Sequence, residues 1–448
     1  MVQRKAPLKS LILSNDMRPI SISMTLICSY HPIPVVLSRG SGAKVWDTEG
    51  VEYLDFLSAY SSVNQGHCHP RLVAAAQNQL SKLTLTSRAF FNDKLGPYAK
   101  FITEFFGYDM VLPMNTGAEG VETAIKLTRK WGYLKVMLLL VTIQKNIPQN
   151  KAIILACEGN FHGRTMTAVS ISSDPVCKDH FGPFLPNVGP VVEQIGYRPI
   201  RYNNLQDLET ALKSHGHLIA GFLVEPIQGE GGIVVPDDGY LKSCYDLCRK
   251  YNVLFIADEI QTGLCRTGKM LGCDYEGFKP DILILGKALS GGMYPISAVL
   301  ANKDIMLCIQ PGEHGSTYGG NPLASAIAIE ALKILQDEDL AKKSFELGNH
   351  FRSVIEGRKH PLVLAVRGKG LMNGVIIDES KLPENIVTWH LCLLFKKSGL
   401  IAKQTQNNII RFAPPLVISH AELDRGIEII LKSLDQIMHC TLSDFKGE

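Results

Sequence analysis

The stretch DILILGKALSGG, residues 281–292, places a lysine directly behind an apolar run. Ile282–Leu285 are apolar without alternation, which is typical of a strand that is covered on both faces. Lys287 follows, and the small residues behind it let another molecule approach the backbone. Such a lysine either reaches to the surface, as most do, or lies in a dry pocket where its amine loses its proton and can attack a carbonyl.

Similar apolar runs lie on both sides of this stretch, with helical patterns between them. This alternation predicts an α/β fold in which helices cover both faces of a mostly parallel central sheet. The predicted strands are 110–115, 152–157, 218–226, 253–259, 281–287 and 296–301, and the predicted helices between them are 117–131, 205–214 and 239–251.

After about residue 320 the pattern changes to long helical stretches and short strands, which predicts a smaller α+β domain. We predict an N-terminal segment at 1–75 that packs with this small domain, a large cofactor-binding domain at 76–320 and the small domain at 321–448. Within the small domain we expect one long helical stretch at 321–355, a strand at 363–377, a helix at 385–398, a strand at 409–413 and a helix at 420–437.

The composition excludes several classes of function. A formal net charge of +3 over 448 residues gives no electrostatic reason to expect a nucleic-acid partner. No run reaches the roughly 20 apolar residues that span a bilayer. The eleven cysteines include no CxxC pair, so we expect reduced thiols and no metal site. The basic, serine-rich N-terminus fits a targeting peptide or an exposed leader, and we expect the mitochondrial matrix or the cytoplasm.

Polar groups follow three of the predicted strands, at the edge where open α/β sheets bind ligands. Glu225 and Glu230 follow one strand, Asp258 ends the next, and Lys287 ends the third. Strand-end carboxylates are most often helix caps or ion-pair partners. An aspartate near a reactive lysine instead suggests pyridoxal phosphate (PLP), because the carboxylate keeps the pyridine nitrogen protonated.

The stretch PMNTGAEGVETAIKL, residues 113–127, supplies a candidate phosphate site. A strand ends here, Thr116 and Gly117 form a turn, and a helix starts near Ala118, so backbone amides can bind phosphate. A nucleotide phosphate loop is excluded, because Ala288 stands where GxxxxGK[ST] requires Ser or Thr. A nicotinamide-dependent enzyme is disfavoured, because no GxGxxG follows the first strand.

Six motifs in this order resemble those of class III, PLP-dependent aminotransferases. The resemblance implies PLP-transferase fold type I, and a homodimer with a shared active site or a higher oligomer. Further stretches, VNQGHCHP, KLTLTSRAF, RGKGLMNGVII and IIRFAPPL, resemble the members that act on ornithine. The six motifs are NTGAEGVETA (115–124), GNFHGRT (159–165), VEPIQGEGG (224–232), ADEIQTG (257–263), LGKALSGG (285–292) and HGSTYGGNPLA (314–324).

The resemblance implies roles for four residues around the cofactor ring. Lys287 would bind PLP covalently and then act as general base and acid. Asp258 would pair with the pyridinium nitrogen, and Gln261 would hydrogen-bond near the ring hydroxyl. Phe161 would stack on the ring face, where a core aromatic is the alternative interpretation.

The resemblance also implies a phosphate site and a partner subunit. Gly117 and Ala118 would bind the phosphate through their backbone amides. Thr317 would add a hydroxyl to the phosphate of the partner subunit, so the active site would lie at a dimer interface.

Five residues match positions that bind substrates in the family. Arg411 would hold the α-carboxylate of glutamate and 2-oxoglutarate, because a guanidinium fork suits a carboxylate. Glu230 would pair with that arginine when ornithine is bound. Tyr30 and Arg164 would hold the α-end of ornithine, with Tyr60 lining the pocket, so that the δ-amine faces the cofactor.

The expected reaction moves the δ-amino group of L-ornithine to 2-oxoglutarate. It yields glutamate and glutamate 5-semialdehyde, which cyclises to pyrroline-5-carboxylate, and it belongs to arginine catabolism and proline biosynthesis. A transaminase for acetylornithine or 4-aminobutyrate shares the same cofactor residues and stays an alternative. A non-catalytic scaffold protein with the same fold is a more remote alternative.

Two stretches depart from the family pattern. The chain reads LICSY before Tyr30, where the family usually reads close to GAHNY. The connection WGYLKVMLLLVTIQKNIPQNKAII, residues 131–154, is longer and more apolar than in the family, and we expect VMLLLVT (136–142) to form a buried helix or a strand edge.

Overall fold

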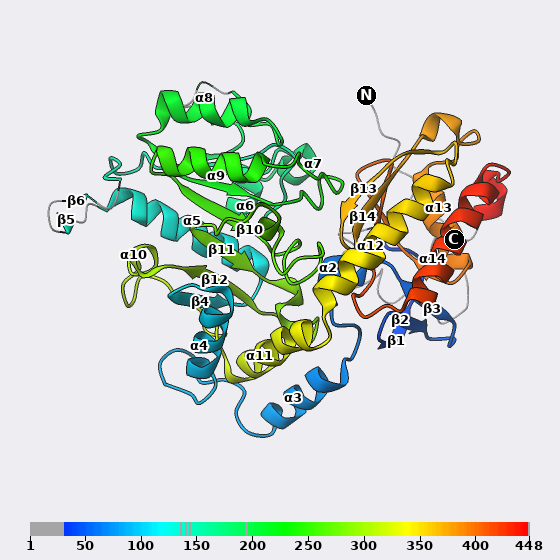
Figure 1. Cartoon of the computed structure of the whole chain (residues 1–448), viewed down its shortest axis with the longest axis horizontal. Helices are drawn as coiled ribbons and strands as arrows, with labels where there is room; N and C mark the ends of the chain where they lie inside the picture. The colour runs from blue at the N-terminus through cyan, green and yellow to red at the C-terminus, as the bar shows by residue number, and fades with distance from the viewer. Residues whose placement is uncertain are drawn as a thin grey trace.

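The computed structural model describes residues 31–134, 137–138, 141–142, 145–192, 196 and 198–446. A large α/β part carries a seven-stranded sheet, and a smaller part carries two four-stranded sheets (Figure 1). None of the described helices is long and apolar enough to cross a membrane.

The large sheet confirms the predicted mostly parallel α/β fold. Its strand order is β4-β12-β11-β10-β9-β7-β8, and only β12 runs antiparallel to its neighbours. The central strands are apolar because helices cover both faces. The strands are β4 (Met110–Met114), β7 (Ile153–Ala156), β8 (Val188–Gly189), β9 (Ile219–Val224), β10 (Leu254–Asp258), β11 (Ile282–Leu285) and β12 (Ser297–Ala301).

Two groups of helices cover this sheet. Helix α5 (Gly117–Tyr133) packs its apolar side on one face, and α8 (Leu205–His215) and α9 (Tyr240–Lys250) pack on the other. Helix α11 (Pro322–Asp337) packs against the turn that begins at Lys287. The remaining helices of this part are α3 (Pro70–Leu80), α4 (Leu95–Phe106), α6 (Met166–Ile171), α7 (Pro175–Lys178) and α10 (Lys303–Met306).

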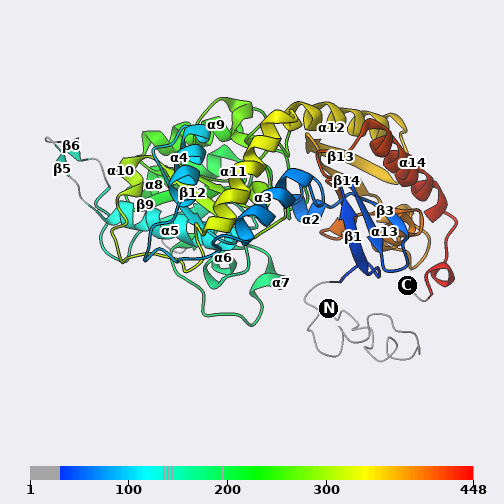
Figure 2. The ribbon, with the colours of Figure 1, turned by 90° about the horizontal axis from the view of Figure 1, so that it is seen from below.

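The smaller part combines both ends of the described chain. Strand β3 pairs in parallel with β15, with Leu54 opposite Leu400, so the three N-terminal strands and one short strand of the C-terminal part form a single sheet (Figure 2). The domain boundaries near 75 and 320 stay a prediction. The elements are β1 (Leu37–Ser41), β2 (Lys44–Asp47), β3 (Glu52–Asp55), α12 (Leu340–Gly357), β13 (Val363–Lys369), β14 (Met372–Ile377), α13 (Thr388–Lys397), β15 (Leu400–Ile401), β16 (Lys403–Thr405), β17 (Ile409–Phe412) and α14 (His420–Ile437).

Two predicted elements are each two elements in the structure. The helical stretch 321–355 breaks at Asp339, whose φ of +49° separates α11 from α12. The strand 363–377 is the hairpin β13–β14, which turns at Gly370 with a φ of +56°. A Cβ on Gly370 would lie 2.3 Å from the backbone of Thr267, so only glycine lets this turn dock against the large part.

The long connection after α5 forms a short hairpin at the outer end of that helix (Figures 1 and 2). Its strands are β5 (Met137–Leu138) and β6 (Val141–Thr142). The rest of the stretch 136–142, for which we expect a buried helix or a strand edge, lies outside the described residues. Beyond it, the Lys145 amine donates to the carbonyls of Ile219 and Tyr251, which ties the returning chain to the large part.

Candidate active site

Lys287 begins a short 3-10 turn, two residues beyond the end of β11. Its φ of +44° is a left-handed conformation that side-chain-bearing residues rarely adopt, and such strain is concentrated at functional sites. Burial and the nearby Arg411 charge lower the pKa of the Lys287 amine to about 8, against the opposing charges of nearby carboxylates. A substantial fraction of this amine is therefore neutral and nucleophilic near neutral pH.

Asp258 ends β10 on the neighbouring parallel strand, opposite Ile284. Its Oδ2 lies 2.7 Å from His162 Nδ1, and its Oδ1 accepts the Ile260 amide at 3.1 Å. Burial lowers the pKa of His162, but its hydrogen bond to Asp258 and the charge of that carboxylate outweigh burial and raise it. The pair holds a carboxylate in a fixed orientation beside Lys287.

The candidate phosphate turn at the start of α5 has the strand–turn–helix geometry that the sequence predicts. Thr116 and Glu119 form a reciprocal capping box, in which each side chain accepts the other's backbone amide. The amides of Gly117 and Ala118 lie at the helix start, where no intrahelical acceptor reaches them. A Cβ on Gly286 would lie 3.6 Å from the Gly117 Cα, so the turn is adjacent to the Lys287 strand.

The loop that carries Phe161 reaches the same place from β7. A Cβ on Gly163 would lie 2.9 Å from the Ala118 Cβ, so this loop touches the phosphate turn. The Arg164 guanidinium lies over the Phe161 ring at 5.4 Å, and its Nη1 lies 2.7 Å from the Cys177 sulfur. Phe161 and Arg164 therefore border the site together.

The small part contributes a buried arginine. Arg411 on β17 is 1% exposed, and its Nη1 lies 3.1 Å from Glu230 Oε1. Its Nη2 donates to Ser61 Oγ at 2.9 Å. Gln261 Nε2 lies 3.4 Å from the same Glu230 oxygen, which joins this pair to the strand end at Asp258.

A left-handed turn presents Tyr60 and Ser61 to that arginine. All four residues of α2 (Ser58–Ser61) have a positive φ, from +46° to +69°. Asp55 Oδ1 accepts the Leu57 and Ser58 amides, and Ser58 Oγ donates to the Ala413 carbonyl at 2.7 Å. The Tyr60 ring lies 5.7 Å from the Arg411 guanidinium carbon as a result.

Ten of the twelve predicted site residues lie around this one place, and one described residue does not. Thr317 is exposed on a separate loop, where the neighbouring Ser316 accepts from Asn115 of the phosphate turn at 2.9 Å. Tyr30 lies outside the described residues. The ten are Tyr60, Gly117, Ala118, Phe161, Arg164, Glu230, Asp258, Gln261, Lys287 and Arg411.

Two site residues and one residue that links the two parts cannot be predicted from the sequence. His162 stands inside GNFHGRT, but nothing in its spacing links it to Asp258, which lies 96 positions away. Ser61 reaches Arg411 only through the left-handed turn. Arg266 is completely buried and donates to Asn64, Leu371 and Pro414, which joins the large part to both ends of the small part. Only the fold brings these partners together.

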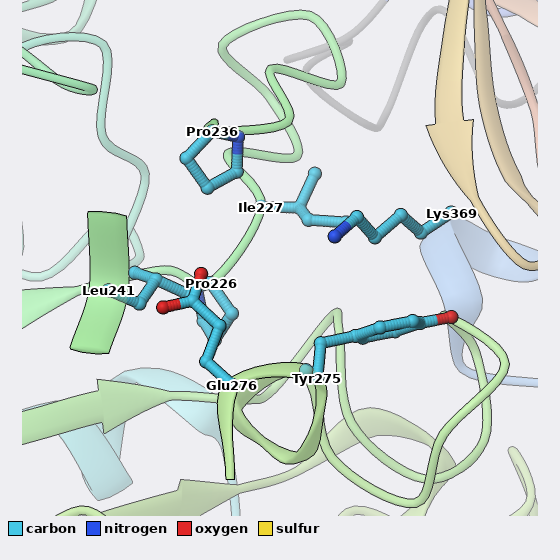
Figure 3. A pocket seen from close by; sticks show the side chains of 8 residues that line it. Pro226, Ile227, Pro236, Leu241, Tyr275, Glu276 and Lys369 are labelled. Carbon is cyan, nitrogen blue, oxygen red and sulfur yellow. The ribbon is translucent and has the colours of Figure 1, made fainter. Parts of the chain in front are cut away.

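A small cavity, which none of the predicted site residues lines, lies between the loop after β9, the 3-10 turn Gly272–Glu276 and the end of β13 (Figure 3). Lys369 spans it, with its amine 4.4 Å from the centre of the Tyr275 ring. Its volume of about 10 Å³ suits a single water rather than a substrate.

The donor set fits PLP. The helix-start amides of Gly117 and Ala118 suit the phosphate, and Asp258 suits a protonated ring nitrogen. The buried Gln261 Oε1 has no partner among the described residues, and it can meet a polar substituent of a bound ring. Lys287 supplies the amine that the cofactor aldehyde requires.

Known proteins resemble this chain along most of its length. Ornithine aminotransferase car2 of Schizosaccharomyces pombe is 56% identical over 409 residues, covering 91% of each chain. A crystal structure of ornithine aminotransferase from Toxoplasma gondii ME49 superposes with a TM-score of 0.86 at 45% identity, covering 94% of each chain. An acetylornithine aminotransferase structure from Elizabethkingia anophelis has a TM-score of 0.81 and 50% identity, covering 93% of this chain and 97% of its own. The family model "Aminotransferase class-III" matches residues 27–434, and the chain belongs to the class III aminotransferases.

Proposed function

We propose that this enzyme transfers the δ-amino group of L-ornithine to 2-oxoglutarate, giving glutamate and glutamate 5-semialdehyde. The observation that carries the proposal is the Glu230–Arg411 pair beside Lys287. An arginine that can be paired or released lets one pocket accept a cationic amine donor and a dicarboxylate acceptor in turn.

PLP, when bound, supplies an electron sink for the charge that develops as the substrate loses a proton. Gly117 and Ala118 would hold its phosphate, and Phe161 and Gln261 would lie beside its ring. Asp258, oriented by His162, would keep the ring nitrogen protonated.

Lys287 performs the proton transfers of the reaction. Its lowered pKa of about 8 leaves part of the amine neutral, so the amine can accept a proton from the substrate carbon and later donate one. The strained backbone at Lys287 and the strand before it fix the place from which the amine acts.

Substrate choice rests on which partner Arg411 takes. With 2-oxoglutarate, the guanidinium binds the α-carboxylate, and Glu230 gives up its contact. With ornithine, Glu230 keeps Arg411 paired, while Tyr30, Tyr60 and Arg164 hold the α-end of the substrate. The δ-amine then points toward Lys287.

We also propose a homodimer with shared active sites. Thr317 is exposed, while its neighbour Ser316 binds the phosphate turn of its own chain, so the Thr317 hydroxyl can serve the partner's phosphate. Mixing Lys287→Ala and Thr317→Ala subunits tests this: hybrid dimers recover activity in one of their two sites only if Thr317 acts across the interface. The compartment, mitochondrial matrix or cytoplasm, stays a prediction.

The rivals within the family are transaminases for acetylornithine or 4-aminobutyrate. The semialdehyde product is trapped and quantified with ornithine and 2-oxoglutarate, beside Lys287→Ala as the matched inactive variant. Wild type should form the trapped product, and the variant should form none while retaining some PLP through the phosphate contacts. Undiminished turnover by Lys287→Ala contradicts the assignment of this lysine, and a protein that binds no PLP supports the scaffold alternative.

A further inference from the structure

Glu225 is a buried carboxylate that the reaction above does not use. It lies directly behind β9 and is 4% exposed. Its two oxygens accept different backbone amides: Oε1 accepts Phe161 at 2.9 Å, and Oε2 accepts Gly229 at 3.1 Å. One side chain therefore joins two loops that leave neighbouring strands of the sheet.

Both loops carry groups that border the cofactor site. Phe161 lies in the loop after β7, which also touches the phosphate turn through Gly163. Gly229 precedes Glu230, the partner of Arg411. A Cβ on Gly229 would lie 2.5 Å from Gln261 Oε1, so the loop is packed directly against Gln261.

The chemistry of Glu225 suits an anchor with two fixed bonds. An ionised carboxylate is an acceptor on both oxygens, whereas a glutamine presents a donor on one side. Burial raises the pKa of Glu225 to about 7, His162 opposes that rise, and Asp258 adds to it. Hydrogen bonds from two backbone amides and the nearby His162 imidazole therefore stabilise a carboxylate whose charge burial disfavours.

We propose that Glu225 is a positioning residue of the active site: its carboxylate fixes the Phe161 backbone, and so the ring that covers the cofactor, and fixes Gly229, and so the Glu230 that pairs with Arg411. Glu225 itself touches neither substrate nor cofactor in this account. The inference rests on the proposed sites for PLP and ornithine. It adds one residue that positions groups in both of these sites.

Glu225→Gln is the diagnostic variant, because it keeps the size of the side chain and turns one acceptor into a donor. Glu259→Gln is its matched control. Glu259 directly follows β10, is 0% exposed and also accepts two backbone amides, from Gly272 and Cys273 at 2.9 and 2.8 Å. Both backbone partners of Glu259 lie in a turn that carries none of the predicted site residues, and its third partner is the hydroxyl of Thr262. The two variants therefore differ mainly in which backbone segments they anchor.

PLP is titrated into each apoenzyme, and the visible circular dichroism of the bound cofactor is recorded together with the melting temperature. Glu225→Gln should bind PLP roughly tenfold more weakly, with a smaller dichroic signal per bound cofactor, because one amide loses its acceptor. Glu259→Gln should lower the melting temperature by a similar amount and keep the PLP affinity within about twofold. Equal PLP affinities for Glu225→Gln and wild type overturn the proposal, whatever the melting temperatures.

A double-mutant cycle with Phe161→Ala separates positioning from a general loss of structure. If Glu225 acts through the Phe161 ring, Glu225→Gln weakens PLP binding in the wild type but has little effect once the ring is gone. Equal effects in both backgrounds contradict the proposal. If Glu225→Gln does not fold, Glu225→Asp, which keeps the charge and is too short to reach both loops, replaces it in the same cycle.

A substrate comparison tests the second anchor. Glu225→Gln, which weakens the hold on Gly229, should lower kcat/KM for ornithine several-fold more than for 2-oxoglutarate. The reason is that only ornithine requires Glu230 to be paired with Arg411. An equal loss for both substrates contradicts this part. The PLP measurements do not depend on ornithine. If the enzyme does not react with ornithine, the proposed substrate is wrong, but the effect of Glu225 on Phe161 can still be tested.

Discussion

Arg411 and Glu230 form an ion pair of 3.1 Å in which the arginine is 1% exposed and the glutamate 29%. The two ends of the pair are held differently. Arg411 is fixed by β17 and by Ser61, whereas Glu230 lies on a loop that Gln261 and Glu225 support. The Nε of Arg411 has no partner among the described residues, so the guanidinium retains a free donor for an incoming carboxylate. The glutamate side chain is therefore the more exposed and less firmly held member of the pair.

Glu230→Ala should shift the enzyme toward dicarboxylates. Without its partner, the buried Arg411 charge favours an α-carboxylate in every half-reaction. We expect kcat/KM for ornithine to fall at least tenfold, while that for 2-oxoglutarate stays the same or rises. Single-turnover kinetics of each half-reaction measures this, and an equal loss in both would assign Glu230 a merely structural role.

The covalent uptake of PLP by the apoenzyme should accelerate with rising pH. The pKa of Lys287 is lowered to about 8, chiefly by burial, and the neutral amine is the attacking form. The rate should therefore rise roughly tenfold for each pH unit below 8 and level off above it. Stopped-flow absorbance of PLP uptake between pH 6.5 and about 9.5 checks the profile. A rate that keeps climbing beyond pH 9.5 would mean an unperturbed lysine.

His162→Phe tests the orientation of Asp258. The variant keeps an aromatic ring of similar volume and removes the 2.7 Å bond to the carboxylate. A charge-assisted hydrogen bond of this kind contributes about 1.5–3 kcal/mol, so kcat should fall roughly ten- to hundred-fold. Met166→Leu, an exposed change on the following helix, is the control. An unchanged kcat for His162→Phe would show that Asp258 needs no support.

Much of this architecture can be predicted from the sequence. The contacts that cannot be predicted depend on how distant segments pack together. The apolar strands and the polar groups behind them are local patterns, so Lys287, Asp258 and the Thr116–Gly117 turn can be predicted together. The His162–Asp258 bond and the Glu225 anchors depend on which strands become neighbours. No local pattern carries that information.

The two broken elements show the same limit on a smaller scale. Helical periodicity continues across Asp339, and the apolar residues of 363–377 continue across Gly370. Single residues with positive φ interrupt each of them. A glycine signals such a turn, but an aspartate inside a helical pattern does not.

Ala59→Gly should stabilise the protein. Ala59 is exposed and has a φ of +46°, which costs a residue with a Cβ about 1 kcal/mol. We expect a higher melting temperature and an unchanged KM for both substrates. Ala59→Val is the matched opposite change, and it should lower the melting temperature, because a β-branched side chain tolerates a positive φ less well than alanine does. A lower melting temperature for Ala59→Gly would contradict the left-handed turn.

Arg266→Met should destabilise the protein by about 3–5 kcal/mol, because it leaves the buried acceptors of Asn64, Leu371 and Pro414 without their donor. Burial, together with the charge of Arg411, lowers the pKa of Arg266 to about 9. Arg358→Met, which breaks a half-exposed pair with Asp435, should cost less than about 1 kcal/mol. Urea unfolding of both variants checks the difference, and similar losses would contradict the linking role of Arg266.

The central claim is that this enzyme takes the δ-amino group from L-ornithine. The most direct measurement is the visible absorbance of the bound cofactor when the purified enzyme is mixed, without any acceptor, with L-ornithine, acetylornithine or 4-aminobutyrate. The account predicts that L-ornithine converts the cofactor to its amine form, with glutamate 5-semialdehyde released in equal amount, and that 4-aminobutyrate leaves the spectrum unchanged. Conversion by acetylornithine or 4-aminobutyrate but not by L-ornithine would contradict it.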